Sequence, residues 1–162
     1  MKVLVTAASK YGGTRGIAEA IGKTLEESGH TAVVIDPDVV GDLEGYDAVV
    51  LGSGVYMGRW MVAATSIADR LASHPHPTWL FSSGPVGEPP SPEEVPADVA
   101  QITELIGARG HRLFGGKLFK SELGFAERAV VTALRAPEGD FRDWDAIAAW
   151  ARRIAAELDA AD

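Results

Sequence analysis

Short apolar runs alternate along the chain with longer segments in which apolar residues recur every three or four positions. The runs lack the every-second-residue alternation of a half-exposed strand, as is typical of parallel strands buried on both faces. They lie at residues 3–8, 31–35, 47–52, 78–83 and 111–115. The segments between the runs predict helices. The first helix carries a stripe of Ile17, Ala18, Ile21 and Leu25, and the last a stripe of Ile147, Trp150, Ala151, Ile154 and Leu158.

Alternating strands and helices predict a parallel sheet with helices on both faces, which is a three-layer α/β/α fold with a five-stranded sheet. No linker divides the chain, so we expect one domain over residues 1–162. An irregular stretch at about 116–140 predicts an insert between the fifth strand and the last helix. The insert should contain a short helix with Phe125, Val130, Ala133 and Leu134. We expect Asp143 to cap the last helix.

The composition narrows the chemistry that the chain can perform. It has 162 residues, 46% of them hydrophobic and 23% charged, and no cysteine. Disulfides, thiolate zinc sites, iron–sulfur clusters and a cysteine nucleophile are therefore excluded, and redox chemistry would need an organic cofactor or a metal with other ligands. The net charge of −8 argues against nucleic-acid binding, which depends on neutralising phosphates. No signal peptide is visible, and no apolar run approaches the roughly 20 residues of a membrane span, so we expect a cytoplasmic protein.

The turn after the first predicted strand is the strongest candidate for a binding site. It consists of Ser9, Lys10, Tyr11, Gly12, Gly13 and Thr14. Its glycines permit positive φ and close approach of the backbone, so several N–H groups can point into one concavity where the helix begins. Together with the positive end of the helix dipole, such a concavity favours a phosphate. An ordinary strand–helix turn with Thr14 as the N-cap is the alternative interpretation.

Two further glycine-containing loops follow the third and fourth predicted strands. The first contains Ser53, Gly54, Val55, Tyr56, Met57, Gly58 and Trp60, and the second contains Ser82, Ser83, Gly84, Pro85, Val86 and Gly87. Ligands of open α/β sheets bind outside the carboxyl ends of the strands, so we expect all three loops at one edge. Tyr56 or Trp60 could stack on a planar ring there, although aromatic residues in such a loop could instead only cover the sheet.

Four segments together carry a family resemblance: VLVTAASKYGGTRGIAEAI, YDAVVLGSGVYMGRW, WLFSSGPVG and GDFRDWDAIAAWARRIA. They resemble the flavodoxin superfamily, in particular its branch of menaquinone-dependent protoporphyrinogen dehydrogenases and related flavodoxin-domain proteins. The resemblance implies the strand order 2-1-3-4-5 and FMN as cofactor. It places the FMN phosphate on residues 9–14 and the isoalloxazine ring between residues 53–60 and 82–87. Short-chain flavodoxins usually have a hydroxyl residue where Tyr11 stands and hold the phosphate without basic side chains, so Tyr11, Lys10 and Arg15 depart from that pattern.

The resemblance implies an FMN-dependent oxidoreductase, which in this branch would pass electrons from protoporphyrinogen IX or a similar substrate to menaquinone. The alternatives are a non-catalytic flavodoxin-type electron-transfer protein and a flavodoxin-like domain that has lost its cofactor. A redox protein or a quinone is therefore the expected partner. The insert at 116–140 could pack over the sheet edge or make peripheral membrane contact. No side chain is an obvious general base, no metal site is expected, and the substrate and the oligomeric state stay open.

Overall fold

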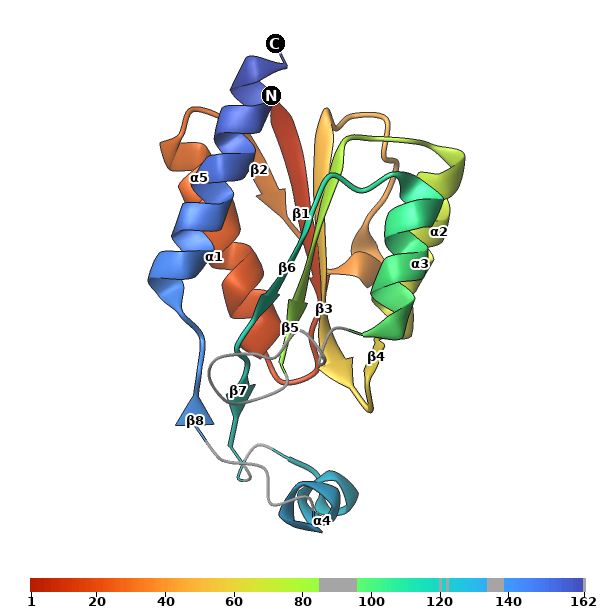
Figure 1. The fold of residues 1–162 in the computed structure, drawn as a ribbon, viewed down its shortest axis with the longest axis vertical. Coiled ribbons are helices and arrows are strands. Elements are labelled where there is room, and N and C mark those ends of the chain that lie inside the picture. The colour runs from red at the N-terminus through yellow and green to blue at the C-terminus, as the bar shows by residue number, and fades with distance from the viewer. Residues whose placement is uncertain (85–95, 120, 122, 134–138, 162) are drawn as a thin grey trace.

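The central element of the structure, a computed structural model, is a sheet of five parallel strands. The residues described are 1–84, 96–119, 121, 123–133 and 139–161. The parallel strands are β1 (Lys2–Ala8), β2 (Thr31–Val34), β3 (Ala48–Tyr56), β5 (Thr78–Ser83) and β6 (His111–Phe114). Their spatial order is β2-β1-β3-β5-β6 (Figure 1). Counted along the chain, the parallel strands therefore have the predicted order 2-1-3-4-5.

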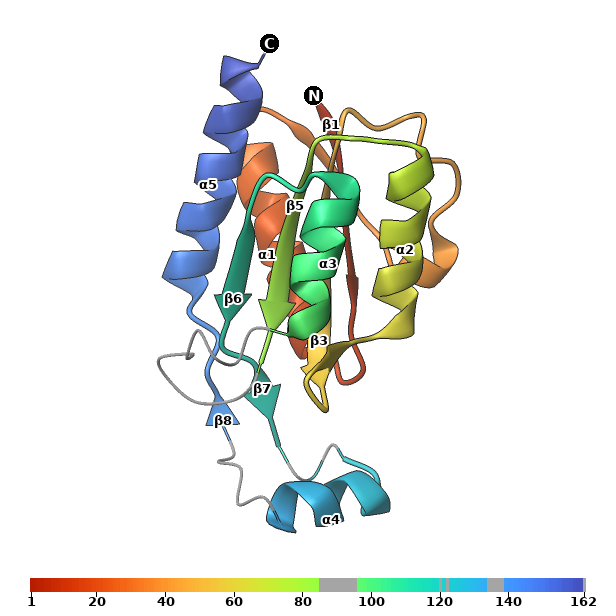
Figure 2. The same ribbon diagram turned by 45° about the vertical axis from the view of Figure 1, so that its right-hand side comes forward.

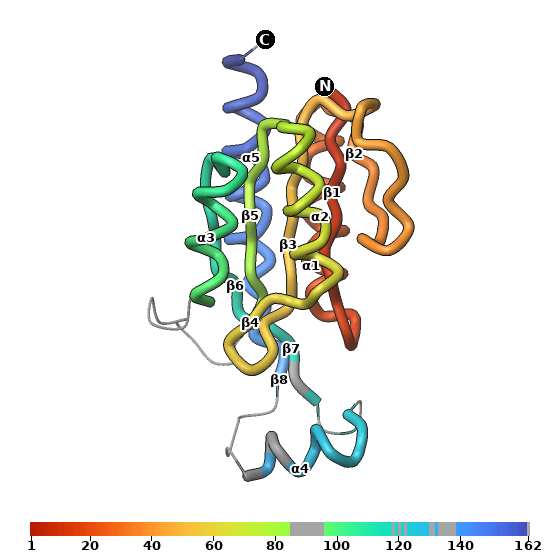
Figure 3. Tube along the Cα trace, turned by 90° about the vertical axis from the view of Figure 1, so that its right-hand side faces the viewer, coloured from red at the N-terminus to blue at the C-terminus, as the bar shows by residue number. Residues whose placement is uncertain are grey.

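Helices cover both faces of this sheet and complete three layers (Figures 1 and 3). One face carries α1 (Gly13–Glu27) and α5 (Trp144–Ala160), and the other carries α2 (Val62–Ser73) and α3 (Ala97–Ile106). A short 3-10 helix, η1 (Pro37–Val39), follows β2. Asp143 caps α5 as predicted, because its carboxylate accepts a hydrogen bond of 3.0 Å from the N–H of Ala146. The predicted α/β/α fold is confirmed.

The core has two parts because neighbouring residues of each strand point to opposite faces and both are buried. Val5 packs with Phe81 and Trp150 on the side of α1 and α5. Leu4 packs with Leu51 and further residues on the side of α2 and α3. Fully burying one such side chain stabilises the fold by about 1.5–3 kcal/mol. Burial on both faces is the physical reason why the apolar runs of the sequence do not alternate.

The segment after the third predicted strand differs in structure from our expectation. We expected a loop from residue 52 onward, but β3 continues to Tyr56 and turns back into the short antiparallel strand β4 (Arg59–Trp60). The turn residues Met57 and Gly58 have φ of 53° and 74°, as two-residue hairpins require. The prediction was wrong because we took Gly52 as the end of the strand. A Cβ there would lie 2.2 Å from the Phe81 ring, so this glycine makes room for that ring in the core and does not form a turn.

The segment between β6 and α5 leaves the three layers. It contains β7 (Lys117–Leu118), α4 (Phe125–Ala133) and β8 (Gly139–Asp140), and β7 pairs with β8 in an antiparallel ribbon. Figure 2 shows α4 beyond the carboxyl ends of the parallel strands. Of the residues expected in the short helix, Leu134 lies outside the described residues. Among the helices of the described ranges, none has the length and apolar character needed to cross a membrane.

Candidate functional site

The three predicted loops meet at the carboxyl ends of β1, β3 and β5. Strand register brings them together, because Ala8 is paired with Ser53 and Gly54 with Ser83. Of the third loop, the structure describes Ser82, Ser83 and Gly84. Its other predicted site residues, Pro85, Val86 and Gly87, lie outside the described residues. The expectation that these loops share one edge therefore holds for every described part of them.

The loop between β1 and α1 leaves the start of the helix open. Gly12 is the N-cap with φ of 84°, and its N–H donates a hydrogen bond of 3.1 Å to the Ser9 hydroxyl. The helical hydrogen bonds begin with the N–H of Gly16, which donates to the Gly12 carbonyl at 3.0 Å. The N-cap residue, Gly12, has no side chain to cap α1, and within the described residues the N–H groups of residues 13–15 have no hydrogen-bond acceptor, so they stay available to a ligand or to water. The alternative with Thr14 as N-cap is wrong, because Thr14 lies inside the first turn.

Thr14 lies against Gly54, at the point where the β1–α1 loop meets β3. A Cβ on Gly54 would lie 3.0 Å from the Thr14 hydroxyl oxygen and 3.0 Å from Cε2 of Tyr56, so only glycine allows this close approach. Thr14 is 4% exposed. Within the described part of the chain, its hydroxyl has no hydrogen-bond partner. This oxygen is not among the fully buried side-chain atoms that lack a partner, so it stays accessible to a ligand at the same place as the open helix end.

Tyr56 is the aromatic side chain that borders this place. Its ring reaches back over Gly54, and its hydroxyl accepts a hydrogen bond from the Lys10 backbone. Burial raises the pKa of Tyr56, while that hydrogen bond and the Lys10 ammonium lower it to a smaller extent. Met57 is strongly exposed at the tip of the hairpin, next to Gly58. The edge therefore offers a flat ring beside the Thr14 hydroxyl and the start of α1.

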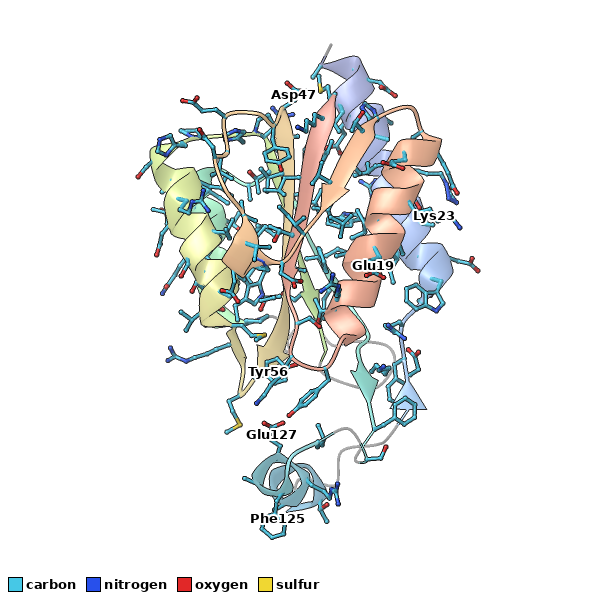
Figure 4. The ribbon with its side chains drawn as sticks, turned by 180° about the vertical axis from the view of Figure 1, so that it is seen from behind. Glu19, Lys23, Asp47, Tyr56, Phe125 and Glu127 are labelled. Atoms are coloured by element: carbon cyan, nitrogen blue, oxygen red, sulfur yellow. The ribbon has the colours of Figure 1, made fainter. Side chains whose placement is uncertain are left out.

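The two basic side chains that depart from the flavodoxin pattern are both ion-paired. Lys10 pairs with Glu127 of α4, and its Nζ lies 5.6 Å and 5.8 Å from the ring centroids of Tyr11 and Tyr56. Arg15 pairs with Asp36 at 2.9 Å. Figure 4 shows Glu127 pointing from α4 toward the end of β3 that carries Tyr56. Both cations are about half exposed, at 46% for Lys10 and 51% for Arg15.

The chain is similar in sequence and in fold to known proteins. A family model described as the flavodoxin domain matches residues 4–145. The chain belongs to the flavodoxin domain family. An archaeal flavodoxin is 23% identical, with 84% of this chain and 96% of that chain covered and a TM-score of 0.59. The flavodoxin of Streptococcus pneumonia TIGR4 is 16% identical over 100% of both chains, with a TM-score of 0.65. Rubredoxin oxygen:oxidoreductase from Desulfovibrio gigas is 14% identical, with 98% of this chain but 36% of that chain covered and a TM-score of 0.68.

Three predicted site residues of this flavodoxin domain turn their side chains inward. Ser53 donates to the Gly54 carbonyl at 2.8 Å and accepts from the Met61 N–H at 2.9 Å. Trp60 is 5% exposed, and its Nε1–H donates to the Ser82 hydroxyl at 2.8 Å. These side chains hold the hairpin against β5. Of the two aromatic residues that we expected to stack on a ring, Tyr56 is therefore the one at the edge.

His111 completes this support. Its Nε2 lies 2.8 Å from the Ser82 oxygen. Burial lowers the pKa of His111, which favours the neutral ring. In the neutral tautomer with its proton on Nδ1, Nε2 accepts from the Ser82 hydroxyl, which itself accepts from Trp60. No motif in the sequence indicates these hydrogen bonds, because the three residues come from β4, β5 and β6 and meet only in the folded sheet.

Arg142 is a second residue whose position the sequence analysis did not anticipate. Its Nη1 donates to the Gly13 carbonyl at 3.3 Å, and its Nε and Nη2 bind the Asp140 carboxylate at 2.8 Å and 2.6 Å. The guanidinium lies 4.5 Å from the Trp144 ring, and its hydrogen bonds lower the pKa of Asp140. A Cβ on Gly16 would lie 2.6 Å from Nη1. Arg142 thus fixes the first turn of α1 to the segment that leads into α5.

The arrangement suits an anionic ligand with a planar ring better than a metal ion. Within the residues that the structure describes, no group of three histidine or carboxylate side chains could hold a metal. Main-chain donors, the Thr14 hydroxyl and the Tyr56 ring gather at the edge instead. Any redox chemistry at this edge would come from a bound group.

Proposed function

We propose that this flavodoxin domain binds FMN at the carboxyl edge of its sheet and exchanges electrons with a redox partner. The observation that carries the proposal is the Thr14 hydroxyl, which has no hydrogen-bond partner within the described residues, beside the open N-terminus of α1. A phosphate supplies acceptors to both at once, and its negative charge is favoured by the helix dipole. Membership of the flavodoxin domain family supports this assignment.

The residues present fit the cofactor. The N–H groups of residues 13–15 and the hydroxyl of Thr14 would hold the phosphate, and Gly54 lets Thr14 and Tyr56 lie close together at this place. Tyr56 would lie along the ring, with main-chain groups of residues 55–58 near its polar edge. When bound, FMN supplies the capacity to accept and release electrons. The protein would orient the ring through Tyr56 and the main chain beside it.

Two variants of matched size test the phosphate site. Thr14→Val removes the hydroxyl with little change in volume. Because hydrogen bonds to charged groups are worth about 1.5–3 kcal/mol, FMN should bind about 10- to 150-fold more weakly. Riboflavin, which lacks the phosphate, should bind as it does to the wild type. Thr24→Val on the same helix removes a hydroxyl that bonds to the Ala20 carbonyl at 3.0 Å, and it should change neither affinity.

The measurement is a fluorescence titration of the apoprotein with each flavin. If Thr14→Val binds both flavins like the wild type, the phosphate lies elsewhere. If the wild-type protein is colourless when purified and takes up neither flavin, the proposed function itself is refuted. If the purified protein is coloured, chromatography of the released cofactor distinguishes FMN from other flavins.

A second candidate is dehydrogenation of protoporphyrinogen or a similar substrate with a quinone as electron acceptor. It is favoured by the insert, because α4 lies beyond the proposed flavin edge and leaves Phe125 90% exposed, a residue suited to an apolar substrate or a membrane surface. Oxidation of protoporphyrinogen with a menaquinone analogue would support this candidate. No turnover, together with efficient electron exchange with a ferredoxin reductase, would favour the electron carrier.

A further inference from the structure

The contact between Lys10 and Glu127 joins two parts of the chain that are far apart in sequence. Lys10 is the one cationic side chain of the β1–α1 loop, Ser9–Gly12. Glu127 belongs to α4, which lies beyond the edge of the sheet (Figure 2). The two side chains are 46% and 37% exposed, so their ion pair is open to exchange with other ions. The loop that would hold the phosphate is thereby tied to the insert.

The Lys10 ammonium belongs to the loop that would hold the phosphate and lies near the Tyr56 ring. It lies 5.8 Å from the centroid of the Tyr56 ring, and that ring contacts the same point, Gly54, that the Thr14 hydroxyl contacts. A carboxylate carries one negative charge, whereas a phosphate monoester carries nearly two and offers three acceptor oxygens. A phosphate bound at Thr14 therefore competes with Glu127 for the ammonium on favourable terms.

We propose that Lys10 couples phosphate binding to the insert: a phosphate on the β1–α1 loop takes over the Lys10 ammonium from Glu127 and releases α4 from the sheet edge. This inference rests on the proposed function, because FMN brings the phosphate. It assigns Lys10 a role in discriminating phosphorylated from unphosphorylated flavins. It also makes the position of α4 a report of whether the site is loaded.

Phosphate binding and the Lys10–Glu127 ion pair must affect each other equally, so the proposal can be tested from either side. If phosphate binding weakens the Lys10–Glu127 pair, the pair must weaken phosphate binding by the same factor. A pair of this exposure is worth at most about 1 kcal/mol, so Glu127→Gln should tighten FMN binding by about three- to fivefold. Riboflavin affinity should stay within about twofold, because no phosphate competes with Glu127. Lys10→Gln should weaken FMN binding and should abolish any effect of a second Glu127→Gln substitution.

The control separates this local effect from a change in net charge. Glu104 is an exposed glutamate of α3, on the other side of the sheet edge from α4, and Glu104→Gln changes the net charge by the same amount. It should leave FMN affinity unchanged at physiological ionic strength. Hydrogen exchange gives the second measurement. FMN, but not riboflavin, should speed the exchange of amides in residues 123–133 of the wild type, and Glu127→Gln should already exchange at the faster rate.

The outcomes distinguish the proposed coupling from FMN binding itself. Tightening of FMN alone by Glu127→Gln, with faster exchange in α4, supports the coupling. Equal effects of Glu127→Gln and Glu104→Gln, unchanged FMN affinity in Glu127→Gln, or slower exchange of α4 on FMN binding would each overturn it while leaving FMN binding itself intact. Failure of the wild type to bind either flavin would overturn the proposed function and this inference together.

Discussion

Replacing Gly54 by alanine tests the close approach on which the candidate site depends. The added Cβ would lie 3.0 Å from the Thr14 hydroxyl oxygen and 3.0 Å from Cε2 of Tyr56. Tyr56 is 37% exposed, and its ring can swing away. Thr14 is buried in the first turn of α1 and cannot. The substitution therefore has to push the helix start away from β3 by a few tenths of an ångström.

The magnitude follows from overpacking. Adding a methyl group to a packed site costs about 1–3 kcal/mol, which for a domain of this size lowers Tm by roughly 3–10 °C. The displaced hydroxyl should also bind phosphate less well, so that FMN affinity falls about tenfold or more while riboflavin affinity changes less. Thermal unfolding followed by circular dichroism and titration with both flavins measure the two effects.

Gly45 provides the matched control. A Cβ there meets nothing within 4 Å, and its φ is not in the left-handed region. Gly45→Ala should leave flavin binding unchanged and should stabilise the fold slightly, by about 0.4–1 kcal/mol, through the unfolded chain. If Gly54→Ala has the Tm of the wild type and binds FMN with the same affinity, then Thr14 is not held at the site by the contact described here.

Two further predictions concern residues that support the site. Arg142→Gln breaks the link to the Gly13 carbonyl, so it should lower stability by about 1–2 kcal/mol and weaken FMN binding, whereas Arg109→Gln, which removes a cation 5.5 Å from the Trp79 ring, should leave FMN binding unchanged. Equal FMN affinities for both arginine variants would contradict this role. Burial lowers the pKa of His111 below its usual 6.5, so the unfolded chain binds more protons below that pH. The stability that neutral His111 provides is therefore present above pH 6.5 and is lost as the pH falls toward the folded pKa. The drop in Tm between pH 7.5 and pH 5.5 should be smaller in His111→Gln, and an unchanged drop would show that another group causes it.

The sequence predicted the sheet well for a simple reason. Runs such as Val3–Ala8 and Thr78–Ser83 are buried on both faces, so their hydrophobicity alone marks them as parallel strands. The strand order came from the family resemblance and not from these runs. The β1–α1 turn could also be predicted from local residue types, because glycines and hydroxyl residues between a strand and a helix are typical of a turn.

The parts that were missed depend on contacts across long stretches of chain. Gly52 and Gly54 resembled loop glycines, but each leaves room for a side chain from another element. Trp60 follows a hairpin turn, and strand alternation turns it into the core rather than toward the edge. The partners Lys10 and Glu127 are 117 residues apart, and Arg142 and Gly13 are 129 apart. No periodicity or motif encodes such pairs, so only the folded chain reveals them.

The amide resonances of residues 12–15 test the central claim most directly. In the isotopically labelled apoprotein, FMN should shift the amide protons of Gly13, Thr14 and Arg15 downfield, because each gains a charged acceptor, while riboflavin should leave them nearly unmoved. If FMN binds but these three amides do not respond, or respond equally to riboflavin, the phosphate is held elsewhere and the account of the site is wrong.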